Sequence, residues 1–275
     1  MKYVIVRCED HGPYGDSTPS LLAGSKTPHL QQLAQAGAVG LLPFRSDPGA
    51  IAHAQCHRAF FGLGPDDLDA SPGRCYAAGA NLQIAEGETA WCCELITQRD
   101  GRIVDPSAGR ITPKESEILV QALDEALGSD TRQWDSGRGR HHVLTTREGA
   151  LSAADSQHAV EPPEMLVGQP WKRNLPKGRT GEALALLLDQ ALTVLDGHPV
   201  NRVRVDLGEN PANMVWLWGP AAPGPTRTFA ERTGLSGAVV SDGFFLQGFA
   251  RACSLGWKGA PSALEEGPLR KSLKT

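Results

Sequence analysis

The 275-residue sequence predicts an α/β fold, in which a parallel-sheet core carries an inserted α+β domain. Three observations support this prediction: a strand–helix–strand pattern at the start, an antiparallel pattern in the middle, and a return of the α/β pattern at the end. At the start, the apolar residues 3–6 and 38–42 flank a helix that Thr27 caps, with Pro28 at its first position. Two strands joined by a helix within about 40 residues favour a parallel sheet covered by helices.

The middle of the chain has the pattern of antiparallel strands and amphipathic helices. Residues 88–97 are expected to form a strand, and residues 103–105 to pair back on it as a hairpin. Thr112 and Glu115 have the spacing of a capping box, which begins a helix that ends near Leu127. This region therefore differs in type from the start of the chain.

The string NPANMVWLWG, residues 210–219, marks the return of the α/β pattern. Its apolar residues 214–218 lie between turn signals, and this predicts a strand buried on both faces. An amphipathic helix is expected before it at 182–195, and a strand and a helix after it at 237–240 and 244–253.

These changes of pattern predict two structural units. Between residues 129 and 182 only residues 142–145 are expected to form a strand. The pattern changes near residue 70 and again near residue 205. We therefore expect a discontinuous core from residues 1–70 and 205–275, and an insert from residues 72–200.

The composition excludes several classes of protein. With 27 Lys and Arg against 31 Asp and Glu, the net charge is −4, and charges of one sign form no long run. The charge pattern therefore does not indicate nucleic acid or a membrane surface as a partner. No stretch approaches the ~18 apolar residues that a membrane span needs. The six cysteines form no CxxC pair and no zinc spacing, and the chain opens on a strand instead of a signal peptide. These features predict a cytoplasmic protein with reduced thiols.

Two strings carry a resemblance to a known family: HPVNRVRVDLGENPANMVWLWG, residues 198–219, and FAERTGLSGAVVS, residues 229–241. They resemble the archaeal-type cofactor-independent phosphoglycerate mutases, which belong to the alkaline phosphatase superfamily. Further matches follow the family's order along nearly the whole chain: MKYVIV at 1–6, KTPHLQQLAQAGAVGLL at 26–42, CELITQRDGRIVDPSAGRI at 93–111 and EPPEMLVGQP at 161–170.

The resemblance implies an alkaline-phosphatase-like core and the interconversion of 2- and 3-phosphoglycerate, a glycolytic reaction. In this family a serine accepts the phosphoryl group and returns it to the other hydroxyl. Two divalent ions (manganese, zinc or magnesium) clamp the transferring oxygens. The resemblance also implies further Asp and His ligands beyond the last matching segment, so the core is expected to be incomplete at its C-terminus.

The sequence departs from the family pattern where the chemistry is expected. Aligned from Pro48-Gly49, the serine position holds Ala50, and aligned backwards from Gly62 it holds His53. Neither alignment supplies a hydroxyl, so no catalytic nucleophile is expected. His53 and His57, four residues apart with Cys56 between them, have a spacing that can hold a metal, although two histidines on a helix flank are the simpler interpretation.

Asp10 is the expected metal carboxylate, with Glu9 as its rival. One carboxylate cannot hold two hard cations, so no bound metal cofactor is expected. Phosphate and carboxylate groups of a substrate are usually bound by arginine. The candidate substrate-binding residues are Arg110 (where the family more usually has His), Arg140, His141, Arg202 and Arg204.

The sequence therefore predicts a phosphoglycerate mutase-like pseudoenzyme that has kept the binding of a phosphorylated small acid or of a protein partner. Two alternatives stay open: a working mutase or phosphatase that another chain completes or whose site was rebuilt, and a structural subunit that has kept the fold. An incomplete sheet leaves an open edge and apolar surface, so we expect a homo-oligomer or a docked protein partner.

Overall fold

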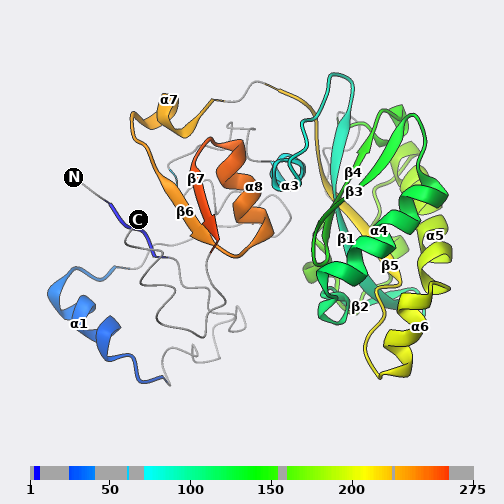
Figure 1. Cartoon of the computed structure of the whole chain (residues 1–275), viewed down its shortest axis with the longest axis horizontal. Coiled ribbons are helices and arrows are strands. Elements are labelled where there is room, and N and C mark those ends of the chain that lie inside the picture. The colour runs from blue at the N-terminus through cyan, green and yellow to red at the C-terminus, as the bar shows by residue number, and fades with distance from the viewer. Residues whose placement is uncertain are drawn as a thin grey trace. The chain divides into compact units, whose positions relative to one another are not determined.

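A computed structural model of the chain describes residues 3–6, 25–40, 61, 71–153, 160–224 and 227–259 (Figure 1). The chain divides into two compact units, Met1–Arg45 and Ser46–Thr275. The first unit contains helix α1 (Pro28–Ala36), which begins after Thr27 with proline in its first turn, as predicted. Within the described segments, no helix is both long enough and apolar enough to cross a membrane.

The strands predicted on either side of α1 are not present in the described residues. Residues 3–6 and 38–40 belong to no strand, and residues 41 and 42 lie outside the described part of the chain. The apolar side chains of residues 3–6 are mostly exposed. A strand requires a hydrogen-bonded neighbour, and an apolar run does not by itself supply one.

The second unit is built on a five-stranded antiparallel sheet (Figure 1). Its central strand β1 (Thr89–Arg99) pairs antiparallel with β2 (Arg102–Asp105), β4 (His141–Thr146) and β5 (Met214–Ala221). The predicted hairpin of β1 and β2 is confirmed. Strand β3 (Arg132–Arg138), which pairs with β4, was not predicted. Its sequence RQWDSGR buries only Trp134, so it lacks the alternation of apolar and polar residues that marks a strand.

Helices cover the sheet on both faces. Figure 1 shows α4 (Pro113–Leu127) and α5 (Arg179–Asp196) on one face, and α3 (Pro72–Gly79) on the other, where it also packs on α8 (Phe244–Ala252). The predicted capping box of Thr112 and Glu115 begins α4. Helix α6 (Pro199–Asp206) follows α5, and short 3₁₀ turns occupy Ala108–Arg110, Gly149–Leu151, Pro163–Leu166 and Trp171–Asn174.

A parallel pair of strands lies beyond α3 in the same unit. Strands β6 (Ala238–Ser241) and β7 (Gly256–Gly259) are parallel and are joined by α8, while α7 (Phe229–Thr233) precedes them. The fold is thus mixed α/β, with a mostly antiparallel sheet and a small parallel component.

Strand β5 contains the string with two tryptophans, and its residues 214–218 are all buried, as predicted. Trp216 and Trp218 lie on the same face of the sheet because side chains alternate along a strand. The Trp216 indole N–H donates to the Glu161 carbonyl at 2.8 Å, and the Trp218 indole N–H donates to Glu94 Oε1 at 2.9 Å. The side chain of the preceding Asn213 accepts from the Gln98 N–H at 2.9 Å and donates to the Gln98 carbonyl at 3.2 Å, so it has a structural role at the start of the strand.

The pairing of β5 bears on the predicted division of the chain. A core of residues 1–70 and 205–275 with an insert of 72–200 stays a prediction, but its boundary near 205 separates β5 from β1, its neighbour in the sheet. A boundary placed after β5 would keep the paired strands β1 and β5 in the same structural unit. An apolar run shows that a strand is buried, whereas the sheet that it joins depends on distant parts of the chain.

Candidate functional site

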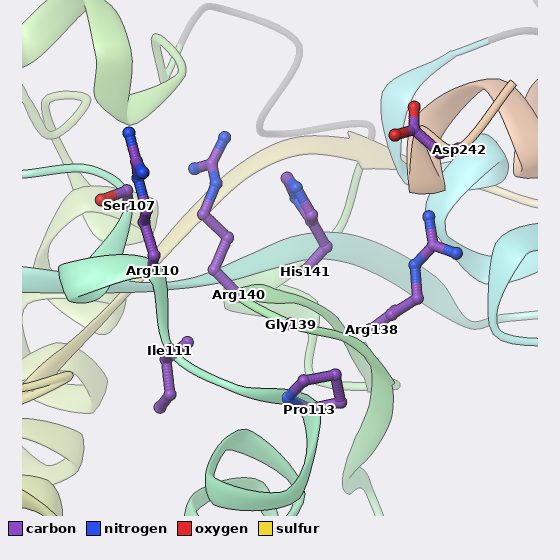
Figure 2. Close-up of a pocket in the computed structure, with 9 residues that line it drawn as sticks. All are labelled: Ser107, Arg110, Ile111, Pro113, Arg138, Gly139, Arg140, His141 and Asp242. Carbon is purple, nitrogen blue, oxygen red and sulfur yellow. The ribbon is translucent and has the colours of Figure 1, made fainter. Parts of the chain in front are cut away.

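A pocket of about 520 Å³ opens in the second unit where three loops meet (Figure 2). It is lined by residues from the segment before α4, from the β3–β4 turn and from the β6–α8 loop: Ser107, Arg110, Ile111, Pro113, Arg138, Gly139, Arg140, His141 and Asp242. Figure 2 shows Arg110, Arg140 and His141 in a row with their side chains pointing the same way, and Asp242 beyond Arg138. Cationic side chains therefore dominate the pocket.

The carboxylate of Asp105 organises the first wall. Its Oδ1 accepts from the Ser107 N–H at 2.8 Å and the Ser107 hydroxyl at 2.6 Å, and its Oδ2 accepts from the Gly109 N–H at 2.8 Å and the Asn210 amide at 2.9 Å. Partial burial acts to raise the pKa of Asp105, but these hydrogen bonds outweigh it and lower the pKa. The ionised carboxylate thus folds the loop that carries Arg110.

A tight turn between β3 and β4 forms the second wall. Gly139 has a φ of 60°, a conformation that favours glycine, and the pairing register shifts between Asp135 and Arg138. A Cβ on Gly137 would lie 2.2 Å from the His141 carbonyl oxygen, so this close approach also requires glycine. The turn presents Arg138 and His141 to the pocket.

A buried group of side chains lies behind the pocket, and Glu94 is its centre. We call this group, Glu94, Tyr76, Arg140 and Trp218, the floor; of these four residues Arg140 lines the pocket itself. The buried carboxylate accepts hydrogen bonds from the Tyr76 hydroxyl at 2.5 Å and the Trp218 indole at 2.9 Å, and it forms an ion pair with Arg140. Burial acts to raise the pKa of Glu94, but Arg140, His141 and Tyr76 outweigh it and lower the pKa to about 2. Glu94 is therefore an anion at neutral pH.

His141 connects the floor to the pocket. Its Nδ1 lies 2.8 Å from the Tyr76 oxygen, and its ring stacks on Phe244 with the ring centroids 5.8 Å apart. Burial, and next the charge of Glu94, raise the pKa of Tyr76 well above its usual value, so the Tyr76 hydroxyl stays protonated and donates a hydrogen bond to Glu94. The Tyr76 oxygen then accepts from Nδ1–H of His141. This contact leaves Nε2 as the ring nitrogen of His141 that can contact a ligand.

Three of the predicted substrate-binding residues meet in this pocket: Arg110, Arg140 and His141. Arg110 is exposed, and its side chain makes no hydrogen bond or ion pair with the described part of the chain. Arg140 is less available, because it donates to Glu94, to the Pro106 carbonyl at 2.9 Å and to Glu164. Burial opposes the charge of Arg140, but Glu94 and Glu164 outweigh this and raise its pKa, so it stays protonated.

The other two predicted residues, Arg202 and Arg204, do not line the pocket. Arg202 is exposed on α6. Arg204 is 2% exposed, and its guanidinium donates to Glu115 and to backbone carbonyls. A buried guanidinium with its donors occupied cannot bind a substrate, so the expected role of Arg204 is corrected to a structural one.

Arg138, Ser107 and Asp242 line the pocket but were not predicted. The signal for Arg138 was present in the string RGRHH, since a glycine turn between two arginines places both at the same end of a hairpin. Asp242 belongs to no motif in the sequence that indicates a ligand. It reaches the pocket through the packing of α8 on α3, which no local pattern reveals.

The predicted catalytic and metal positions lie outside the described residues. These are Asp10, with its rival Glu9, and Ala50 and His53, with their neighbours Cys56 and His57. In the segments that the structure describes, no group of three or more His, Cys, Asp or Glu side chains could hold a metal ion. The metal role of Asp10 therefore stays a prediction.

Comparisons with known proteins agree on one family. The family model of 2,3-bisphosphoglycerate-independent phosphoglycerate mutase matches residues 34–201. A mutase of that name from Methanosarcina acetivorans is 31% identical over 256 residues, which cover 90% of this chain and 62% of the relative. A probable mutase from Geobacter sulfurreducens is 30% identical, over 88% of this chain and 61% of the relative. The chain thus spans about three fifths of the length of these relatives.

A solved structure shows the same fold. The structure of a protein from Pyrococcus horikoshii aligns with 88% of this chain and 56% of its own, with a TM-score of 0.55 and 21% sequence identity.

Proposed function

Because the chain belongs to the 2,3-bisphosphoglycerate-independent phosphoglycerate mutase family, we propose that its pocket binds a phosphorylated hydroxy acid such as 3-phosphoglycerate. We further propose that the chain alone does not interconvert phosphoglycerates. The first proposal rests on the pocket, and the second rests on the sequence at the expected nucleophile position.

The observation that supports binding is a pair of exposed guanidinium groups in one pocket. Neither Arg110 nor Arg138 forms an ion pair within the described residues, although the whole chain carries a net charge of −4. Guanidinium groups bind phosphate and carboxylate in a bidentate manner. Two of them facing one space suit a small ligand with more than one anionic group.

The other pocket residues define the remaining features of the ligand. The ring nitrogen of His141 that does not contact Tyr76 can exchange a hydrogen bond with a hydroxyl or a phosphate of the ligand. The Arg140 guanidinium adds positive charge, and the ligand must compete with Glu164 for its outer nitrogen. A phosphate, a carboxylate and a hydroxyl on one small molecule would use all of these groups.

The absence of a serine hydroxyl supports the lack of turnover. Ala50 and His53 occupy the two positions at which the family resemblance places the nucleophile. Loss of the nucleophile in a serine hydrolase costs on the order of a millionfold in rate. Because neither position carries a hydroxyl, the chain is expected to bind the phosphorylated acid without converting it.

Calorimetric titration with 3-phosphoglycerate tests the binding proposal. We expect Arg110→Gln and Arg138→Gln each to weaken binding about tenfold, the loss of one charge-assisted contact. Arg202→Gln is the matched control, because it removes an exposed arginine outside the pocket and should leave the affinity unchanged. If all three variants bind 3-phosphoglycerate as tightly as the wild-type protein, the ligand binds elsewhere and the proposal is refuted.

An assay for 2-phosphoglycerate with manganese or zinc supplied tests the lack of turnover. We expect a rate no higher than that of a protein-free control. Turnover that disappears in an Asp10→Ala variant would show that a metal-dependent site operates without the expected serine.

A further inference from the structure

Three successive residues beside the pocket adopt the left-handed conformation. The φ angles of Ala108, Gly109 and Arg110 are 50°, 62° and 55°. Glycine adopts such angles freely, but in alanine and arginine the Cβ crowds the backbone, so the conformation needs outside support. Arg110 also lacks a side-chain partner in the described chain, so only this backbone turn aims its guanidinium at the pocket.

Arg204 supports the turn from the interior of the protein. Its Nη2 donates to the Ala108 carbonyl at 3.1 Å and the Gly109 carbonyl at 3.0 Å. Its Nη1 donates to Glu115 at 3.0 Å, which anchors the guanidinium at the start of α4. A Cβ on Gly109 would lie 2.6 Å from Arg204 Nη2, so the two groups are in close contact.

Asp105 supports the turn by accepting hydrogen bonds from backbone N–H groups. Its carboxylate accepts from the N–H groups of Ser107 and Gly109, both at 2.8 Å. Asn210 connects the two supports, because its side-chain amide donates to Asp105 at 2.9 Å and its carbonyl accepts from Arg204 Nε at 3.1 Å.

We propose that Arg204 and Asp105 are positioning residues, which hold the turn of residues 108–110 left-handed and thereby place Arg110 in the pocket. Asp105 bonds the N–H of Gly109 in the turn and that of Ser107 just before it, whereas Arg204 bonds two carbonyls of the turn, so neither support replaces the other. The consequence for the ligand rests on the proposed function, whereas the conformation of the turn can be measured without any ligand.

The backbone coupling constants that report the sign of φ at Ala108 test the proposal directly by NMR. We expect Arg204→Lys to shift them away from the left-handed values, since one ammonium group cannot reach both turn carbonyls and Glu115. Arg202→Lys, the same change on the exposed side of α6, is the matched control and should leave them unchanged. Unchanged couplings in a folded Arg204→Lys protein would overturn the proposal.

Titration with 3-phosphoglycerate tests the consequence for binding. We expect Arg204→Lys to weaken binding about tenfold, and Arg110→Gln to add little in the Arg204→Lys background, because both changes remove the same contact. Full additivity would show that Arg204 acts independently of Arg110 and would overturn the proposal. If the wild-type protein does not bind this acid, the proposed function fails, while the coupling constants still decide the positioning role.

A rescue variant separates positioning from general stabilisation. In the Arg204→Lys background, Ala108→Gly should restore part of the lost affinity, because glycine adopts a positive φ without support. If Arg204 only stabilised the fold, the extra glycine would restore nothing. Should Arg204→Lys fail to fold, Asn210→Ala removes the Asp105 side of the network more gently and should shift the same couplings.

Discussion

The charged groups in two layers of the pocket have different surroundings: water in one layer and protein partners in the other. The rim, which we define as Arg110 and Arg138, is exposed and has no ion pair in the described chain. In the floor, Glu94 is only 1% exposed, and its oxygens are occupied by Tyr76, Trp218 and Arg140. The charged groups of the rim can therefore contact a ligand, whereas Glu94 in the floor already has protein partners.

Solvation explains the difference. A charge taken out of water carries a large desolvation cost, so it persists only with partners that satisfy its hydrogen bonds. An exposed guanidinium keeps its water and can exchange that water for a ligand. Stability should therefore depend on the floor, and affinity on the rim.

The largest expected effect is on the floor. Glu94→Gln leaves Arg140 partly buried without its closest counter-ion, and we expect a loss of about 3–5 kcal/mol in the free energy of unfolding. Urea unfolding measures it. The matched control is Glu164→Gln, which removes the exposed partner of Arg140 and should cost less than about 1 kcal/mol. Similar losses in the two variants would contradict the distinction between buried and exposed partners.

A second test uses pH and the buried His142, which lies beside His141 in β4. Burial lowers the pKa of His142 from 6.5 to about 3, so below pH 6.5 the unfolded chain binds a proton that the folded chain excludes. Stability should therefore fall as the pH falls from 6.5 towards 3. Glu94 contributes to this loss only below its unfolded pKa of 4.5.

Between pH 6.5 and 4.5 we expect His142 to account for about 2 kcal/mol of lost stability. Urea unfolding of His142→Asn across this range provides the comparison, because asparagine can accept the hydrogen bond from the Gly137 N–H and does not titrate. A parallel pH dependence in the variant and the wild type would assign the loss to other groups.

The two tryptophans of β5 offer a smaller test. Trp218→Phe removes a hydrogen bond to the charged Glu94 and should cost about 1.5 kcal/mol, whereas Trp216→Phe removes one to the neutral Glu161 carbonyl and should cost about 1 kcal/mol. Thermal and urea unfolding of both variants measure the difference. A larger cost for Trp216 would mean that packing, and not the charge of the acceptor, decides the loss.

The smallest expected effect is on the rim. Arg110→Gln and Arg138→Gln should change the free energy of unfolding by less than about 0.5 kcal/mol, since neither side chain has a protein partner in the described chain. The same urea series measures this, and a loss above 1 kcal/mol would show an unrecognised structural contact. Combined with weaker ligand binding, unchanged stability would separate the rim from the floor most clearly.

Local signals explain which elements could be predicted. The capping box of Thr112 and Glu115 and the apolar stripe of α5 lie within a few residues of the elements that they determine, and both helices form as expected. Strand β3 was missed because its position depends on pairing with β4, and its own sequence has little apolar alternation. The apolar residues 3–6 show the opposite case, since no strand forms there.

The sequence by itself determined the family, the main helices and the buried strand β5. It also predicted Arg110, Arg140 and His141 as binding residues, and these three line one pocket. Only the tertiary structure decided which arginines are free. Arg202 and Arg204 are two residues apart in the same helix, yet one is exposed and the other is buried against residues about 90 positions away along the chain. Desolvation and occupied donors set the role of Arg204, and both depend on contacts that neighbouring sequence does not encode.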